Sequence, residues 1–123
     1  MPTWKVELIP EACEDFKSLD GSVKKQVLKQ LVKLEKNPGY GTALGNKAGI
    51  NLEGYFKLYA MQKKIRIIYE YQDFEHIIKI IAIDKREDLE VYRIAFKRIQ
   101  DSKYCSAGSL PRMKIMWNRL KKI

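Results

Sequence analysis

The stretch that decides the fold runs from Leu52 to Arg98 and contains four short motifs. They are Leu-Glu-Gly-Tyr-Phe-Lys-Leu (52–58), Ile-Arg-Ile-Ile-Tyr (65–69), Ile-Asp-Lys-Arg-Glu (83–87) and Glu-Val-Tyr (90–92). The first three belong to apolar runs that each carry a cation, and the fourth puts a tyrosine in a helical pattern. A lysine, two arginines and a tyrosine that meet on one face of a sheet would form a site for phosphate and bases.

The apolar runs predict strands at about 52–62, 64–72 and 75–84, because short polar breaks separate them. Consecutive strands with such short connections pair as antiparallel hairpins. A helix is expected from about residue 88 to 99, with apolar residues at helical spacing. Together these elements form the second half of the predicted fold.

The N-terminal third supplies a further strand and two helices. Residues 4–9 alternate as a strand, and Pro10 can start a helix that continues to about Leu19. An amphipathic helix follows from Val23 and ends at Asn37-Pro38-Gly39. The predicted fold class is therefore α+β, a small antiparallel sheet of about four strands with an N-terminal helical hairpin and C-terminal helices.

Residues 37–54 contain five of the seven glycines in the chain. The dinucleotide-binding pattern would need a glycine at position 44, which is leucine, and no Gly-Lys-Ser/Thr follows. We interpret this segment as a flexible connection into the sheet.

The chain has 123 residues and a net charge of +9, which suits one globular domain with a basic surface. We predict a single domain over residues 1–123, with a core at about 3–99 and a basic C-terminal extension at about 101–123. The excess positive charge is +2 in residues 1–50, +2 in residues 51–100 and +5 in the remainder. Such a charge favours a polyanionic partner such as nucleic acid or the ribosome, although solubility alone could account for it.

Two distant cysteines, Cys13 and Cys105, form no zinc motif or disulfide framework and suggest a reducing cytoplasm. No signal peptide is evident, because Lys5 and Glu7 interrupt the start. The longest apolar run, at 77–83, is too short to span a bilayer. We therefore expect a cytoplasmic protein without a membrane partner.

Alternation along the first hairpin strand places Tyr55, Lys57 and Tyr59 on one face. Arg66 lies between two isoleucines on the next strand, and Arg86 follows the third. Each of these residues alone could be ordinary exposed sheet surface, but their occurrence in consecutive strands favours a functional site.

These residue types suit RNA cleavage by attack of a 2′-hydroxyl on the neighbouring phosphorus, which requires neither a metal nor a cofactor. Arginine is always charged and binds phosphate oxygens in pairs, and lysine could act as a base if neighbouring cations lower its pKa. The single histidine, His76, is interpreted as structural. Glu87, Asp88 and Glu90 are interpreted as acids that favour the start of a helix.

In these motifs, over roughly residues 3–99, the chain resembles the RelE/ParE superfamily of bacterial toxins in type II toxin–antitoxin systems. Within it, the order and spacing of the motifs resemble the RelE-like messenger-RNA interferases. The resemblance implies metal-independent endoribonuclease activity on mRNA in the ribosomal A site, and inhibition of translation. It also implies a cognate antitoxin, contact with 16S rRNA, and an indirect association with DNA through the antitoxin.

The resemblance assigns catalytic roles to Lys57, Arg66, Arg86 and Tyr92. Lys57 would transfer a proton or stabilise charge, the arginines would bind the scissile phosphate, and Tyr92 would stack on and orient a base. We expect RNA contacts from six further residues, which are Tyr55, Tyr59, Lys85, Arg93, Lys97 and Arg98. Well-studied relatives carry a second lysine where this chain has Tyr59, so Lys57 would do more here, another base such as Lys85 would assist, or the activity would be weak.

Two alternative functions remain open. The same fold in ParE-like members acts on DNA gyrase without nuclease chemistry, and a degenerate relative would only bind RNA or its antitoxin. The basic extension would either contact ribosomal RNA or cover the core with a helix starting near Pro111.

Overall fold

The chain folds around a single mixed sheet, which a computed structural model describes together with its helices for residues 4–47, 49–72 and 76–102. The sheet has five strands in the order β1-β5-β4-β3-β2. The strands are β1 (Lys5–Leu8), β2 (Thr42–Lys47), β3 (Ile50–Ala60), β4 (Ile65–Gln72) and β5 (Ile77–Asp84). The helices are α1 (Pro10–Lys17), α2 (Gly21–Lys36) and α3 (Asp88–Ser102), with a short 3₁₀ turn, η1, at Pro38–Tyr40.

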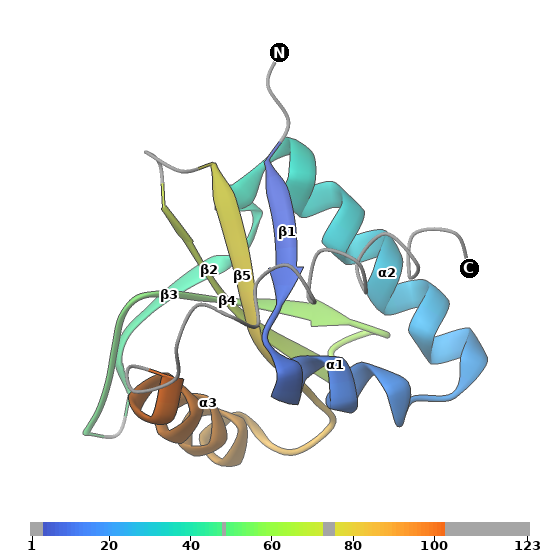
Figure 1. The fold of residues 1–123 in the computed structure, drawn as a ribbon. Coiled ribbons are helices and arrows are strands. Elements are labelled where there is room, and N and C mark those ends of the chain that lie inside the picture. The colour runs from blue at the N-terminus through green and yellow to red at the C-terminus, as the bar shows by residue number, and fades with distance from the viewer. Residues whose placement is uncertain (1–3, 48, 73–75, 103–123) are drawn as a thin grey trace.

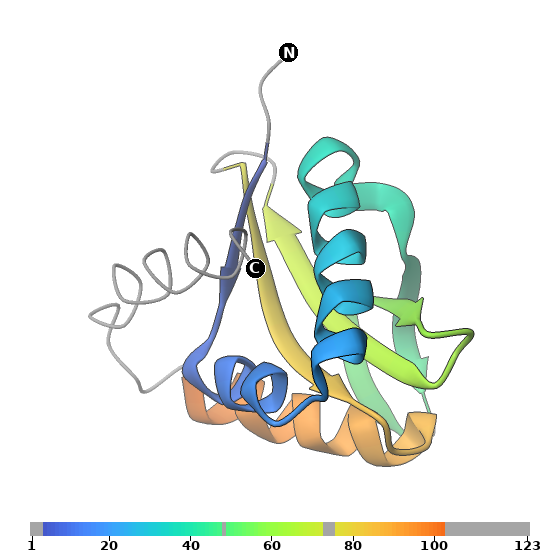
Figure 2. The same cartoon turned by 90° about the vertical axis from the view of Figure 1, so that its right-hand side faces the viewer.

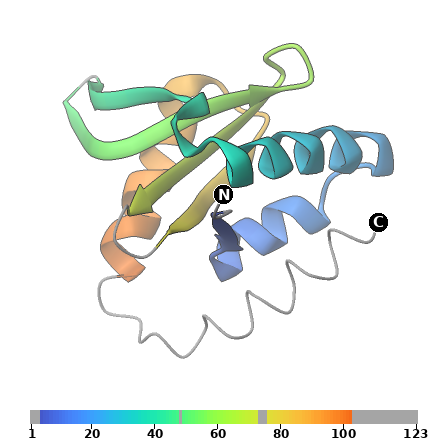
Figure 3. The ribbon, with the colours of Figure 1, turned by 90° about the horizontal axis from the view of Figure 1, so that it is seen from above.

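The predicted α+β class is confirmed, with each of the predicted strands and helices up to residue 102 present. Helices α1 and α2 lie side by side (Figure 3). Helix α3 lies across one end of the sheet (Figures 1 and 2). None of the helices in the described part of the chain has the length and apolar content needed to cross a lipid bilayer.

The core lies mainly between the sheet and the first two helices. Leu52 and Leu58 of β3 are buried on the face toward α2, as alternation predicts. They are joined by Phe16 of α1 and by Leu31 and Leu34 of α2. Because β3 alternates, burying these leucines turns Lys57 and Tyr59 to the opposite face.

The sheet differs from the predicted antiparallel sheet of about four strands in having five strands and in one strand direction. Strand β1 pairs with β5 in parallel, with Lys5 opposite Ile77. The prediction of antiparallel pairing rested on short hairpin connections, and β1 reaches β5 only through the intervening helices and strands. The three remaining pairings in the sheet are antiparallel.

The prediction of a flexible connection at residues 37–54 was wrong, because the segment contains β2 and the start of β3. Strand β2 pairs with β3, with a register shift between Ala43 and Gly45. Gly45 and Gly54 have positive φ angles, of 60° and 87°, which glycine adopts without steric cost. Glycines that signal a loop in isolation therefore serve here as irregular positions within a hairpin.

The predicted linker after residue 103, the helix starting near Pro111 and the basic extension lie outside the described residues.

Candidate functional site

Lys57, Tyr59 and Arg66 meet on the face of the sheet that α3 partly covers. Lys57 and Tyr59 are two residues apart on β3, and Tyr59 is paired directly with Arg66 on β4. The nitrogen Nζ of Lys57 lies 4.8 Å from the centre of the Tyr59 ring, and the guanidinium carbon of Arg66 lies 5.7 Å from it. The aromatic ring thus separates two cations and attracts both.

Asp88, the first residue of α3, occupies the centre of this group. Its Oδ1 accepts a 2.6 Å hydrogen bond from Nε of Arg66. Its Oδ2 accepts hydrogen bonds from the Tyr59 hydroxyl at 3.0 Å and from Nζ of Lys57 at 3.3 Å. We call these four residues, Lys57, Tyr59, Arg66 and Asp88, the Asp88 cluster.

Tyr92 lies one helical turn after Asp88 and also contacts Lys57. Nζ of Lys57 donates a 3.0 Å hydrogen bond to the Tyr92 hydroxyl. The Tyr92 residue is only 5% exposed, so its ring packs in the core between α3 and the sheet. This position favours a role in orienting Lys57 over one in stacking on a base.

The electrostatic environment keeps Lys57 positively charged. Burial lowers the pKa of Lys57, but contacts with the hydroxyls of Tyr59 and Tyr92 and the charge of Asp88 outweigh it, and the net shift is upward. The sequence argument for lysine as a base required a lowered pKa. In this arrangement Lys57 is instead suited to stabilise negative charge or to donate a proton.

Asp88 is correspondingly held as a carboxylate. Partial burial raises its pKa, but hydrogen bonds from Arg66 and Tyr59 and the charge of Lys57 outweigh that effect and lower the pKa below its usual value. The interpretation of Asp88 as an acid that only favours the helix start was therefore incomplete.

Arg86 lies in the turn between β5 and α3 and is more exposed than the Asp88 cluster. Its Nη1 contacts Asp84 at 2.6 Å, and its Nε lies 3.8 Å from Glu90. Its backbone N–H also donates to Asp84. These contacts join Arg86 to two acids outside the Asp88 cluster.

The six predicted RNA-binding residues fall into three groups. Lys85, Arg93 and Lys97 are exposed on or just before α3. Tyr59 belongs to the Asp88 cluster, and Tyr55 is half-buried beside Glu70, where burial and that carboxylate raise the pKa of its phenol.

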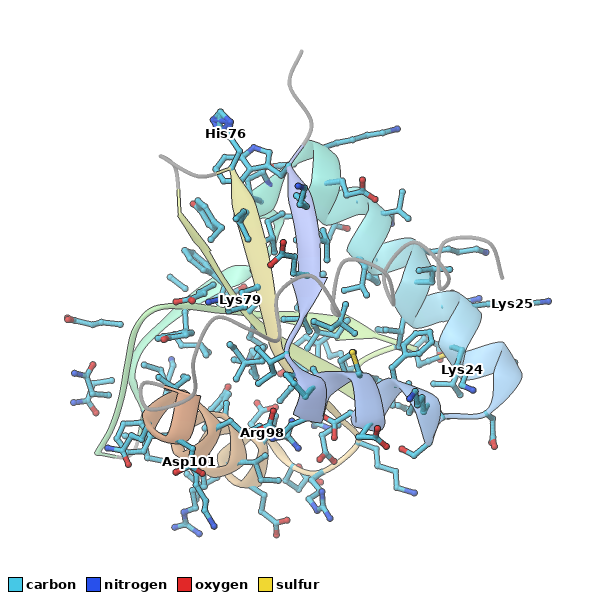
Figure 4. The ribbon with its side chains drawn as sticks, in the orientation of Figure 1. Lys24, Lys25, His76, Lys79, Arg98 and Asp101 are labelled. Atoms are coloured by element: carbon cyan, nitrogen blue, oxygen red, sulfur yellow. The ribbon has the colours of Figure 1, made fainter. Side chains whose placement is uncertain are left out.

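Arg98 forms the third group, and both terminal nitrogens of its guanidinium are engaged within the fold. It donates two hydrogen bonds to the Asp15 carboxylate, at 2.6 and 3.1 Å, and a third to the backbone oxygen of Ile81 at 3.0 Å. Figure 4 shows it at the end of the molecule formed by α1 and α3. We therefore do not include Arg98 in the proposed RNA site.

His76 lies at the opposite end of the sheet from α3 (Figure 4). Its ring packs against Trp4, with 4.9 Å between the ring centres. Both observations agree with the structural role predicted from the sequence.

The sequence interpretation missed Asp88 as a member of the site. Side-chain alternation identified the strand residues, but nothing in the strand pattern shows which turn of a later helix will contact them. The available signal was the spacing Asp88-x-x-x-Tyr92, which places both side chains on one helix face beside the sheet.

Comparisons with known proteins agree with this architecture. No protein-family profile matches the chain. A curated Escherichia coli protein described as a putative RelE-like toxin is 28% identical over 97 residues, which cover 79% of this chain and 98% of that protein.

Solved structures of E. coli RelE share the fold. A mutant of the toxin in the free state has a TM-score of 0.62 and 24% identity, over 79% of this chain and 98% of that one. RelE in the intact E. coli RelBE toxin–antitoxin complex has a TM-score of 0.59 and 19% identity, over 68% of this chain and 98% of that one. The fold is thus that of RelE toxin structures. The resemblance to RelE-like toxins found in the motifs is thus confirmed as a likeness in sequence and fold.

Proposed function

We propose that this protein is the toxin of a toxin–antitoxin pair and cleaves messenger RNA in the ribosomal A site. The observation that supports the proposal best is the convergence of Lys57, Tyr59 and Arg66 on one partly open face. The likeness to RelE toxins supports the same class of function.

In the proposed reaction the 2′-hydroxyl of one nucleotide gives its proton to water and attacks the adjacent phosphorus, and the bond from phosphorus to the 5′-oxygen breaks. Arg66 binds the non-bridging oxygens and stabilises their growing charge. Lys57, held protonated and oriented by Tyr92, stabilises the same charge or protonates the leaving oxygen. Tyr59 offers its ring to a base and its hydroxyl to the phosphate. Arg86, outside the Asp88 cluster, binds a neighbouring phosphate.

The proposed partners are an antitoxin and the ribosome in the cytoplasm. The RelE chain matched above was solved with its antitoxin RelB, which supports a protein partner of this kind here. We propose that three exposed cations contact RNA, including 16S rRNA. They are Lys85, just before α3, and Arg93 and Lys97 on α3. Association with DNA is proposed to occur only through the antitoxin.

The test uses purified ribosomes programmed with a defined mRNA. The wild-type protein should cut within the A-site codon, leaving a 2′,3′-cyclic phosphate, and a 2′-deoxynucleotide at the cut position should abolish cleavage. Arg66→Met and Lys57→Met should each lower the rate by about 10²–10³-fold. Lys25→Met, which removes an exposed lysine on α2 remote from the site (Figure 4), is the matched control.

Absence of A-site cleavage by the folded wild-type protein would overturn the proposal. DNA breaks that depend on gyrase would indicate the ParE-like alternative. Binding of RNA or of an antitoxin without growth arrest on induced expression would indicate a non-catalytic relative.

A further inference from the structure

The Asp88 cluster contains a feature that an RNA-binding site does not require, which is an acid in contact with its cations. Asp88 accepts from Lys57 and Tyr59 through Oδ2 and from Arg66 through Oδ1. A carboxylate has two oxygens on one atom that share a negative charge. The two non-bridging oxygens of a phosphodiester have the same arrangement. The carboxylate thus meets the same donors that a phosphate would use.

The charges around Arg66 and Lys57 are balanced in the present arrangement. Asp88 contacts both cations, and Nη2 of Arg66 lies 3.7 Å from Glu87. Within these ion pairs two positive side chains face two negative ones, which reduces the attraction for a further anion, and a third cation, Nζ of Lys63, lies 5.8 Å from the centre of the Tyr59 ring. A phosphate that approached these cations while Asp88 stayed in place would also be repelled by a neighbouring carboxylate.

The two cations of the Asp88 cluster are held more firmly by the fold than Asp88 is. The side chains of Lys57 and Arg66 are 16% and 14% exposed, whereas that of Asp88 is 37% exposed. Lys57 would retain its hydrogen bond to Tyr92, and Arg66 its 3.5 Å contact with the backbone oxygen of Lys85. Rotation of the Asp88 side chain toward solvent would therefore leave the two cations in place.

We propose that Asp88 is an internal competitor for the substrate phosphate, filling the anion position formed by Lys57, Tyr59 and Arg66 until an RNA phosphate replaces it. The inference rests on the proposed function only in naming RNA as the incoming anion. Lys57 and Arg66 form a preformed anion site whose occupancy Asp88 regulates. Asp88 sets the affinity and contributes no proton transfer.

The alternative role for Asp88 is that of a clip that holds the start of α3 against the sheet and positions the cations. The two roles predict opposite effects of Asp88→Asn, which keeps the shape of the side chain and removes its charge. Removing a competitor strengthens anion binding, whereas removing a positioning group weakens it.

The test measures binding of a short single-stranded RNA, made uncleavable by 2′-O-methyl substitution at every nucleotide, by fluorescence anisotropy at fixed salt. Asp88→Asn should bind it about tenfold more tightly than wild type. Glu87→Gln is the matched control, because it removes the same charge from the adjacent, 90% exposed residue. It should change the affinity by less than about twofold, because its 3.7 Å contact with Arg66 is exposed to water and screened by salt.

Two further variants make the result decisive. Asp88→Ala should show the same gain if Asn itself disturbs the helix start, and circular dichroism should report a native fold for each variant. Arg66→Met combined with Asp88→Asn should lose the gain, because the preformed site then lacks one of its cations. RNA binding by Asp88→Asn that equals that of Glu87→Gln, or falls below that of wild type, would overturn the inference.

The outcome is separable from that of the proposed function. Tighter binding by Asp88→Asn without A-site cleavage by any variant would support the internal competitor and refute the nuclease. A-site cleavage by wild type, together with unchanged or weaker binding by Asp88→Asn, would support the nuclease and refute the competitor.

Discussion

Two arginine–aspartate pairs connect α3 to the rest of the fold, one toward each end of the helix, and they differ in how completely they are enclosed. Toward the C-terminal end, Arg98 pairs with Asp15 of α1. At the N-terminal end, Asp88 pairs with Arg66 of β4. Each pair has an Nη1 or Nε contact of 2.6 Å, so contact distance alone does not distinguish them.

The partners around each acid do distinguish them. Asp15 accepts a two-pronged contact from Arg98 and a 3.0 Å hydrogen bond from the backbone N–H of Ile83, and its side chain is 15% exposed. The more exposed Asp88 side chain accepts only from side chains of the sheet. The Arg98 pair is thus part of the framework, whereas the Asp88 contacts can be exchanged for another anion.

Arg98→Met should produce the largest loss of stability. It leaves the Asp15 carboxylate enclosed without its cation, which typically costs about 2–4 kcal/mol when a largely buried pair is broken. Urea unfolding followed by circular dichroism measures the loss as a lower midpoint with an unchanged slope.

Arg93→Met is the control for this comparison, because it removes an exposed arginine from the same helix. It should change the free energy of unfolding by less than about 0.5 kcal/mol. Adding Asp15→Asn to Arg98→Met should recover part of the loss, because no unpaired charge then remains. A loss below about 1 kcal/mol for Arg98→Met would remove the proposed distinction between the pairs.

Gly41→Ala should produce the next largest loss of stability. It acts on the strands that carry Lys57 and Arg66, the two cations of the Asp88 cluster. A Cβ at position 41 would lie 2.6 Å from the backbone oxygen of Lys57 and 2.6 Å from the Tyr69 hydroxyl. Relieving such contacts in a packed region costs about 1–3 kcal/mol. Thermal unfolding should show the decrease. Gly21→Ala, where the added Cβ meets nothing within 4 Å, should leave stability equal or higher.

Equal melting temperatures for the two glycine variants would show that β2 can move away from β3 without cost. In that case the position of Lys57 would not depend on the close approach of Gly41.

The strand residues of the site could be predicted from the sequence because alternation is a local rule. Leu52 and Leu58 face the core, so Lys57 and Tyr59 must face the other way. Pairing across a short hairpin then brings Arg66 opposite Tyr59. These steps need only neighbouring residues and a connection of known length.

Features that depend on distant packing could not be predicted in this way. The contact of Arg98 with Asp15 joins residues that are 83 positions apart, and the contact of Asp88 with Arg66 depends on how α3 lies across the sheet. Strand β2 was missed because Gly45 and the glycines on either side of the strand favour loops, and the edge of β3 overrides that preference by providing hydrogen bonds. The parallel position of β1 likewise results from a long crossover rather than from a hairpin.

Arg66→Met applies the same substitution to the Arg66–Asp88 pair. It should lower the free energy of unfolding by much less than Arg98→Met does. Asp88 is accessible to water once Arg66 is removed and keeps its contacts with Lys57 and Tyr59. Methionine also preserves the apolar stem of the arginine. The expected loss is less than about 1 kcal/mol in the same urea assay. A loss equal to that of Arg98→Met would show that both pairs are framework contacts.

The contribution of Asp88 to the acid dependence of stability should be the smallest of these effects. Burial raises its pKa, but Arg66, Tyr59 and Lys57 lower it further, so the folded protein holds the carboxylate below its ordinary value. A depressed folded pKa adds stability above the unfolded value of about 3.9, and that stability is lost as the pH falls through the folded pKa. Because Asp88 is more than one-third exposed, water screens the interaction, and a few tenths of a kcal/mol are expected.

Titration of the Asp88 side-chain carboxyl carbon by NMR provides the direct measurement. The midpoint should lie below the ordinary value in wild type and rise in Arg66→Met, whereas Arg93→Met should leave it unchanged. A midpoint that is ordinary in wild type and insensitive to Arg66→Met would mean that the cations do not hold Asp88 in solution. Lys57 and Arg66 would then be open to anions without competition from Asp88. The difference in stability between the Arg98–Asp15 and Arg66–Asp88 pairs would then result from their exposure to water alone.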